Sequence, residues 1–139
     1  MRSIYFLLML SLFFYSSSSN VGNKIAQCAQ EQLGKPFKTG GNGPDYFDDF
    51  GLVYYCMKKL NLPCFIDRKS QAQQGKKISY AELKPGDVLY AYDKKYNLIS
   101  AIIYFAYGKV IYTKYTKGVI INDISHLNYE HHYDYRRNY

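Results

Sequence analysis

The 139-residue sequence contains no tryptophan, only three cysteines, and no more than four prolines and ten glycines. This scarcity of proline and glycine, beside a 47% share of hydrophobic residues, excludes a collagen-like chain, a low-complexity linker and a disordered tail. Three cysteines are too few for a small scaffold built on disulfides, and an odd number leaves at least one thiol free or paired between chains in an exported protein. The length allows one domain.

Only one long hydrophobic run is present, and it lies at the start of the chain. Arg2 precedes the twelve residues Ile4–Tyr15, which are broken only by Ser11, and Ser16–Ser19 follows. Twelve residues of helix span about 18 Å, less than the roughly 30 Å hydrocarbon core of a membrane, which argues against an anchor. The layout is typical of a signal peptide. We expect cleavage after Ser19, a secreted, extracellular domain over residues 20–139, and no membrane span.

Positive charge predominates, with 18 Lys and Arg residues against 11 Asp and Glu residues and a net charge of +7. The basic residues include four separate pairs: Lys58–Lys59, Lys76–Lys77, Lys94–Lys95 and Arg136–Arg137. Scattered pairs are typical of a solvated surface. The alternative is long-range attraction to an anionic wall polymer or a cell-surface glycan. No nucleic-acid-binding motif is present, so no nucleic-acid partner is expected.

The hydrophobic pattern predicts helices in the first half of the chain and strands in the second. The expected helices are Asn23–Leu33, a second one capped by Asp48 or Asp49 and ending near Leu60, and a short one over Arg68–Gln74. The expected strands are Val88–Tyr92, Ile99–Tyr107, Lys109–Thr113 and Val119–Asn122, and the alternation of Tyr133, Tyr135 and Arg137 allows a final edge strand. Helices followed by adjacent strands indicate an α+β domain with an antiparallel sheet of about five strands.

The cysteines leave their pairing open. Cys56 falls on the apolar face of the second predicted helix, where an unpaired cysteine behaves as a small buried hydrophobic residue. In an oxidising compartment, Cys28 and Cys64 could pair with each other or with Cys56. Spacing alone does not decide among these connectivities.

Seven short motifs follow one another along the chain: Leu33–Phe37, Gly40–Asp45, Phe47–Val53, Arg68–Gly75, Leu83–Val88, Ile99–Gly108 and Tyr135–Arg137. Their residue types and order resemble those of the NlpC/P60 family of papain-like cell-wall endopeptidases, which cleave the peptide stem of peptidoglycan. The resemblance covers nearly all of Ile25 to Arg137. It implies a papain-like fold, with N-terminal helices packed on the antiparallel sheet.

The same resemblance shows that the catalytic residues of the family are missing. Family members carry a cysteine at the start of the second helix, a histidine base on a neighbouring strand, and a third polar residue, usually histidine, on the next strand. The cysteine must be a thiolate to attack, and the imidazole must protonate the departing amine. Here these positions hold Asp49, Ala101 and, if the turn at Tyr107–Gly108 is one residue shorter, Tyr112, while Phe50 replaces a serine. The resemblance therefore implies a pseudoenzyme without catalytic residues.

We expect the secreted domain to bind a peptide, a cell-wall or glycan ligand, or a protein partner. The candidate binding residues surround the vacant cysteine position: Phe37, Gly40, Gly41, Asp48, Asp49 and Phe50. Two alternatives remain: a structural or adhesive protein with tyrosine-rich surfaces and, less favoured, a hydrolase that uses Asp49. The three histidines, at 126, 131 and 132, lack the cysteine or carboxylate spacing of a zinc site, so a solvated tail, no metal and no cofactor are expected.

Overall fold

The computed structural model describes residues 20–139, and the predicted signal peptide at residues 1–19 lies outside the described residues. Within this range the helices are α2 (Asn20–Glu31), α3 (Asp49–Lys59) and α4 (Arg68–Ala72). The strands are β1 (Lys76–Ile78), β2 (Val88–Tyr92), β3 (Leu98–Ala106), β4 (Lys109–Lys114), β5 (Gly118–Asp123) and β6 (His132–Arg137). No helix between residues 20 and 139 is long and apolar enough to cross a membrane.

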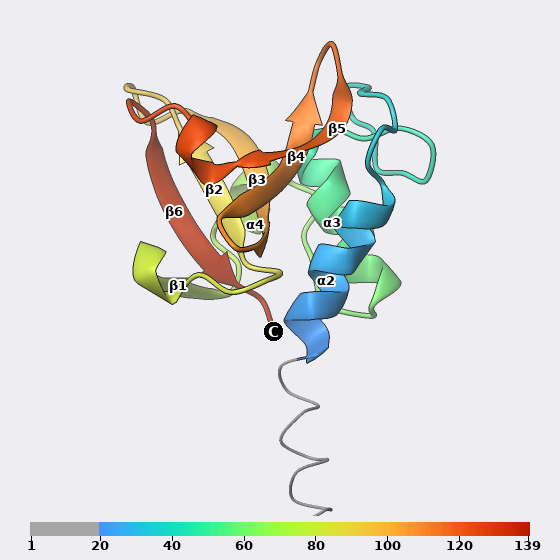
Figure 1. The fold of residues 1–139 in the computed structure, drawn as a ribbon, viewed down its shortest axis with the longest axis horizontal. Coiled ribbons are helices and arrows are strands. Elements are labelled where there is room, and N and C mark those ends of the chain that lie inside the picture. Colours follow the sequence, from blue (N-terminus) through green and yellow to red (C-terminus); the bar gives the residue numbers. More distant parts are fainter. Residues whose placement is uncertain (1–19) are drawn as a thin grey trace, which may run out of the picture.

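The strands form one antiparallel sheet in the order β1-β6-β2-β3-β4-β5 (Figure 1). The predicted α+β class and antiparallel sheet are confirmed, but two details differ. The short strand β1 was not expected, because only Ile78 of its three residues is buried. The C-terminal strand β6 was expected at an edge, yet it lies between β1 and β2 because it pairs with both.

The hydrophobic core lies between the sheet and the two longer helices. Both α2 and α3 contact β3, and they contact each other (Figure 1). Side chains alternate along each strand, so every second residue faces the helices. In β4, Ile111 packs in the core beneath the helices, whereas Val110 and Tyr112 pack on the opposite face of the sheet. This alternation decides which strand residues can reach the start of α3.

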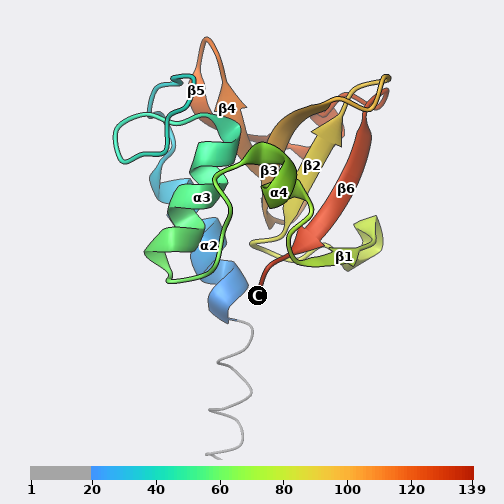
Figure 2. The same ribbon diagram turned by 180° about the vertical axis from the view of Figure 1, so that it is seen from behind.

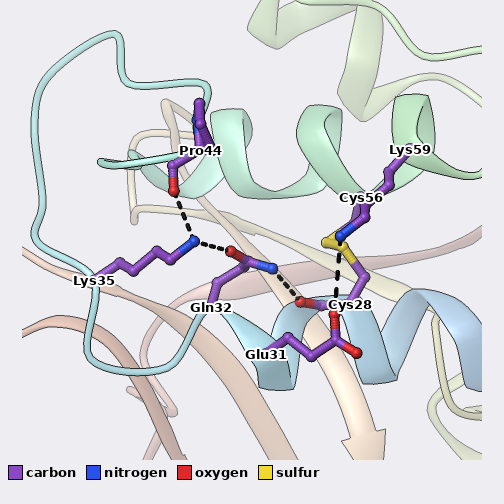
Figure 3. The surroundings of a disulfide bond; sticks show 7 residues. All are labelled: Cys28, Glu31, Gln32, Lys35, Pro44, Cys56 and Lys59. Atoms are coloured by element: carbon purple, nitrogen blue, oxygen red, sulfur yellow. Dashed lines mark hydrogen bonds and ion pairs between the residues drawn. A yellow bond between two sulfur atoms is a disulfide. The ribbon is translucent and has the colours of Figure 1, made fainter.

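A disulfide joins the two longer helices. Figure 3 shows Cys28 of α2 bonded to Cys56 of α3. The Cα atoms of the two residues are 5.7 Å apart. One turn further along, the side-chain amide of Gln32 donates to the Cys28 carbonyl (2.9 Å). Lys35 donates from Nζ to Gln32 Oε1 (2.6 Å) and to the carbonyl of Pro44 (2.8 Å). The end of α2 therefore holds the loop that precedes α3.

This pairing is one of the connectivities that the spacing left open. Cys56 is fully buried, as expected, but as half of a disulfide rather than as an isolated thiol. Cys64 is a free, half-buried cysteine, and burial raises the pKa of its thiol to about 11.

Candidate functional site

The loop before α3 folds back onto the start of that helix. The backbone N–H of Asp48 donates to the carbonyl oxygen of Gly41 (2.9 Å), and the N–H of Gly41 donates to the carbonyl of Lys38 (2.8 Å). Gly51, in the first turn of α3, lies directly against this loop, since a Cβ there would come within 1.8 Å of the Gly41 carbonyl oxygen. Only glycine allows so close an approach of two backbone segments. The glycines therefore bring the loop against the helix N-terminus.

Asp48 connects the loop, α3 and α4. The prediction that one of the two aspartates caps the helix is confirmed, because Asp48 Oδ1 accepts a hydrogen bond from the N–H of Gly51 (2.6 Å). Its Oδ2 accepts a second bond from the N–H of Gly40 (2.9 Å) and lies 3.7 Å from Nη2 of Arg68. The guanidinium of Arg68 in turn lies over the ring of Phe50, 4.8 Å from its centroid.

Asp49 begins α3 and directs its carboxyl group at the sheet. The hydroxyl of Ser100 on β3 donates to Asp49 Oδ2, and the hydroxyl of Thr113 on β4 donates to Oδ1. Burial raises the pKa of Asp49 above its ordinary value of 3.8, the two hydroxyl hydrogen bonds lower it, and the neighbouring carboxylate of Asp48 raises it, with a net upward shift. A carboxyl group that accepts hydrogen bonds from two hydroxyls thus stands where the sequence resemblance predicts a cysteine.

The structure corrects the predicted third position. Tyr112 packs on the face of the sheet that points away from the helices, so its side chain does not approach Asp49. Thr113, the next residue of β4, is the one that reaches the carboxyl group. A shift of one residue moves a side chain to the other face of a strand, so the predicted Tyr112 cannot contact Asp49 while Thr113 does. Thr113 is buried and Tyr112 only partly so, but this difference is visible only in the folded structure.

Ser100 was also missed, and a β-bulge explains its orientation. Ala91 of β2 pairs with Ser100, but Tyr92 pairs with Leu98, so the register shifts between them and Ile99 has no partner on β2. Bulges redirect side chains relative to regular alternation. The sequence pattern alone therefore could not tell whether Ser100 or the adjacent Ala101 contacts Asp49.

The site has neither a thiol nor an imidazole. Ala101 is buried in the core beneath the helices and has no group that could act as a base. The chain's three histidines lie elsewhere: His126 contacts Asn122, His131 contacts Asn128, and His132 stacks on Tyr96. No group of three or more potential metal ligands occurs within residues 20–139.

The Asp49→Asn variant is expected to become more stable relative to the wild type as the pH rises from about 4 to 8. A carboxyl group whose pKa is raised by folding contributes fully below its ordinary pKa, and this contribution is lost as the pH rises through the folded value. The check is the free energy of urea unfolding of both proteins across this range. The Asp93→Asn variant is the control with the opposite sign, because hydrogen bonds from Asn97 and Lys95 lower the pKa of Asp93. An Asp49 difference that does not change with pH would contradict the prediction.

A pocket of about 270 Å³ lies on the loop side of α3. Its lining residues are Thr39, Gly40, Asn42, Asp48, Phe50, Gly51, Ile66 and Arg68. Three of the predicted binding residues, Gly40, Asp48 and Phe50, therefore meet at one pocket. The other three do not line it. Gly41 is a buried residue of the loop, the carboxyl group of Asp49 points at the strands, and Phe37 packs edge-on against Tyr115.

Comparison with known proteins identifies a family and several relatives. The sequence model described as the NlpC/P60 family matches residues 34–138. The gamma-DL-glutamyl hydrolase of Bacillus subtilis is 34% identical over 112 residues, which are 77% of this chain and 26% of that protein. Two probable endopeptidases of Corynebacterium glutamicum are 27% identical over 95 residues, which are 68% of this chain and 44% of each relative. The chain therefore spans less than half the length of these three curated relatives.

Solved structures share the fold at low sequence identity. NlpC2 from Trichomonas vaginalis matches with a TM-score of 0.78 and 22% identity over 85% of this chain and 46% of that chain. RipD from Mycobacterium tuberculosis matches with a TM-score of 0.69 and 18% identity over 84% of this chain and 96% of that chain. At such identities, the likeness establishes the α+β architecture alone.

Proposed function

Since the chain belongs to the NlpC/P60 family, we propose that it is an exported, non-catalytic member that binds a peptide of the cell wall. The observation that carries the proposal is Asp49, which occupies the position of the family's nucleophile and accepts hydrogen bonds from Ser100 and Thr113. A carboxyl group held in this way takes the place of the reactive thiolate.

The chemistry at the site argues against peptide hydrolysis. A carboxylate that attacks an amide must expel an amine, and Ala101 has no proton to donate to that leaving group. Loss of the nucleophile and base of a comparable catalytic set lowers the rate by about 10⁶-fold. The hydroxyls of Ser100 and Thr113 donate to Asp49 and therefore hold the carboxyl oxygens that would have to attack.

The pocket beside α3 supports a binding role. It combines the charged pair Asp48 and Arg68 with the backbone of Gly40 and the apolar side chains of Phe50 and Ile66. A few polar groups among apolar ones suit a ligand that alternates peptide groups with side chains. RipD, a relative described as a non-catalytic NlpC/p60 domain protein adapted to peptidoglycan binding, is a precedent for this combination.

The experiment pairs a cleavage assay with a binding assay on the purified protein. We expect no release of peptide fragments from peptidoglycan and saturable co-sedimentation with peptidoglycan sacculi. Ile66 is exposed at the pocket, so the Ile66→Asp variant should bind sacculi about tenfold more weakly. The matched control is Ile121→Asp, at an exposed isoleucine on β5. Cleavage abolished by Asp49→Ala would overturn the non-catalytic assignment, and absence of sacculus binding would favour a structural or adhesive role.

Export is supported by the disulfide between Cys28 and Cys56, because such bonds persist in oxidising compartments. We propose that residues 1–19 are removed during secretion and that the extracellular protein begins at Asn20. Intact-mass measurement of the exported protein tests this, and a retained Met1 would contradict it.

A further inference from the structure

A second, larger pocket lies between α4 and the hairpin of β2 and β3. Its volume is about 460 Å³, and its lining residues are Arg68, Lys69, Gln73, Tyr92, Tyr96, Asn97 and Leu98. Figure 2 shows α4 against the sheet beside β2 and β3, so two segments distant in sequence form its walls. Arg68 also lines the pocket beside α3, which places the two pockets next to each other.

The lining of this second pocket is positively charged, with Arg68 and Lys69 and no carboxylate. Arg68 forms an ion pair with Asp48, with Nη2 and Oδ2 3.7 Å apart. Lys69 forms no ion pair with any residue between 20 and 139.

Three aspartates lie nearby, and each already has partners. Asp134, whose charge acts on Tyr92, pairs with Nζ of Lys77 (3.5 Å). Asp67 caps the start of α4, and Asp93 lies in the turn between β2 and β3. Asp67 accepts hydrogen bonds from the N–H and hydroxyl of Ser70, and Asp93 accepts from the N–H groups of residues 95 and 97.

Tyr96 forms an aromatic platform at the rim of the pocket. Its ring stacks on that of His132, with centroids 4.6 Å apart and planes 8° apart, and the residue remains 69% exposed. Its φ of 60° is in the left-handed region, a conformation that strains a residue other than glycine. The bond from the Tyr96 N–H to the Asp93 carbonyl (2.9 Å) helps to hold this conformation. The fold thus keeps a strained tyrosine with one ring face covered and the other free.

We propose that this pocket binds a sugar that carries a carboxylate group. Arg68 and Lys69 supply charged donors for the carboxylate. The free face of Tyr96 suits the C–H groups of a pyranose ring, because the face of an aromatic ring is electron-rich. The side-chain amide of Gln73 can donate and accept hydrogen bonds, as sugar hydroxyl groups require. The amide of Asn97 donates one N–H to Asp93 (3.1 Å) and keeps its second N–H and its carbonyl oxygen for a ligand. This binding goes beyond the proposed recognition of wall peptide and does not depend on it.

The experiment is an NMR titration of the protein with two matched pairs of sugars. N-acetylmuramic acid differs from N-acetylglucosamine by a lactyl carboxylate, and glucuronic acid differs from glucose by its carboxylate. We expect the acid of at least one pair to bind about tenfold more tightly than its neutral partner, because the charged contact is lost in the latter. The acid that binds more tightly identifies the source as a muramic acid freed of its stem peptide, whose lactyl carboxylate is then no longer an amide, or as a uronic acid. Equal binding within both pairs, or tighter binding of γ-glutamylglutamate than of either acid, would overturn the proposal.

Two variants locate the binding. Lys69→Gln removes the charge, and Tyr96→Asn removes the ring while retaining a residue that tolerates positive φ. Each should weaken binding of the acidic sugar about tenfold. The controls Lys117→Gln and Tyr115→Asn make the same changes at the exposed turn between β4 and β5 and should leave it unaltered. Unchanged binding by both pocket variants, in proteins whose NMR spectra remain folded, would refute the site.

Sacculus binding, measured in parallel, separates this inference from the proposed function. Pocket variants that lose the acidic sugar but still sediment with sacculi would support two sites. Absence of sugar binding in a protein that sediments normally would remove this inference alone.

Discussion

Replacing Arg137 with methionine is expected to lower the free energy of unfolding by about 3–5 kcal/mol. Asp87 is fully buried, and its carboxylate accepts hydrogen bonds from Arg137 Nε (2.9 Å) and Nη2 (2.8 Å) and from the N–H of Lys84 (2.7 Å). Without the guanidinium, a charge would remain buried with no partner of opposite sign. Arg137 also donates to the carbonyl of Glu82 (2.8 Å), so the variant detaches the end of β6 from the turn before β2.

Urea unfolding measures this loss of stability. Two further variants show whether it comes from the buried charge. Lys109→Met breaks the exposed pair with Asp123, whose atoms are 2.7 Å apart, and should cost less than about 1 kcal/mol. Adding Asp87→Asn to Arg137→Met should recover part of the loss, because the uncompensated charge disappears. If Arg137→Met and Lys109→Met lower the free energy of unfolding by similarly small amounts, the buried pair contributes no more than a surface pair.

Replacing both Cys28 and Cys56 with alanine is expected to lower the free energy of unfolding by about 3–4 kcal/mol. The bond closes a loop between residues 28 positions apart, and its removal increases the conformational freedom of the unfolded chain. Unfolding curves of the wild type with and without a reducing agent should show a loss of similar size.

The third cysteine provides the control for this experiment. Cys64 is free and half-buried, so Cys64→Ala should change stability much less. The stability of the Cys64→Ala variant should still fall when a reducing agent is added. The stability of the variant that lacks both Cys28 and Cys56 should not change. A wild-type protein whose stability is unaffected by reduction would contradict the assigned pairing.

At the start of α3, the residue that the sequence resemblance places at the family's nucleophile position makes a structural contact. Asp49 links the helix to β3 and β4 through the hydroxyls of Ser100 and Thr113. The neighbouring pocket meanwhile keeps Asp48 and Arg68 in contact with the glycine loop. A polar pocket beside a site that has neither a thiol nor an imidazole is the arrangement expected under the proposed function, in which the domain binds without cleaving.

Local patterns in the sequence determined the helices, the central strands and the family. Asp48 precedes an apolar helical pattern, and its side chain caps α3 because it can accept from the free N–H groups of the first turn. The β-branched and aromatic runs of β2 to β5 are separated by short turns, so neighbouring strands pair in sequence order. The same motifs placed Asp49 and Ala101 at the positions where the resemblance predicts a cysteine and a histidine.

Only the tertiary structure decided the features that depend on contacts between distant segments. The bond between Cys28 and Cys56 requires α2 and α3 to lie side by side, and spacing along the chain does not reveal that distance. The place of β6 between β1 and β2 depends on pairing between residues 40 or more positions apart in the sequence. Thr113, rather than Tyr112, reaches Asp49 because one residue of register exchanges the two faces of β4. Local propensity is encoded residue by residue, whereas register and pairing are settled by the packing of the complete fold.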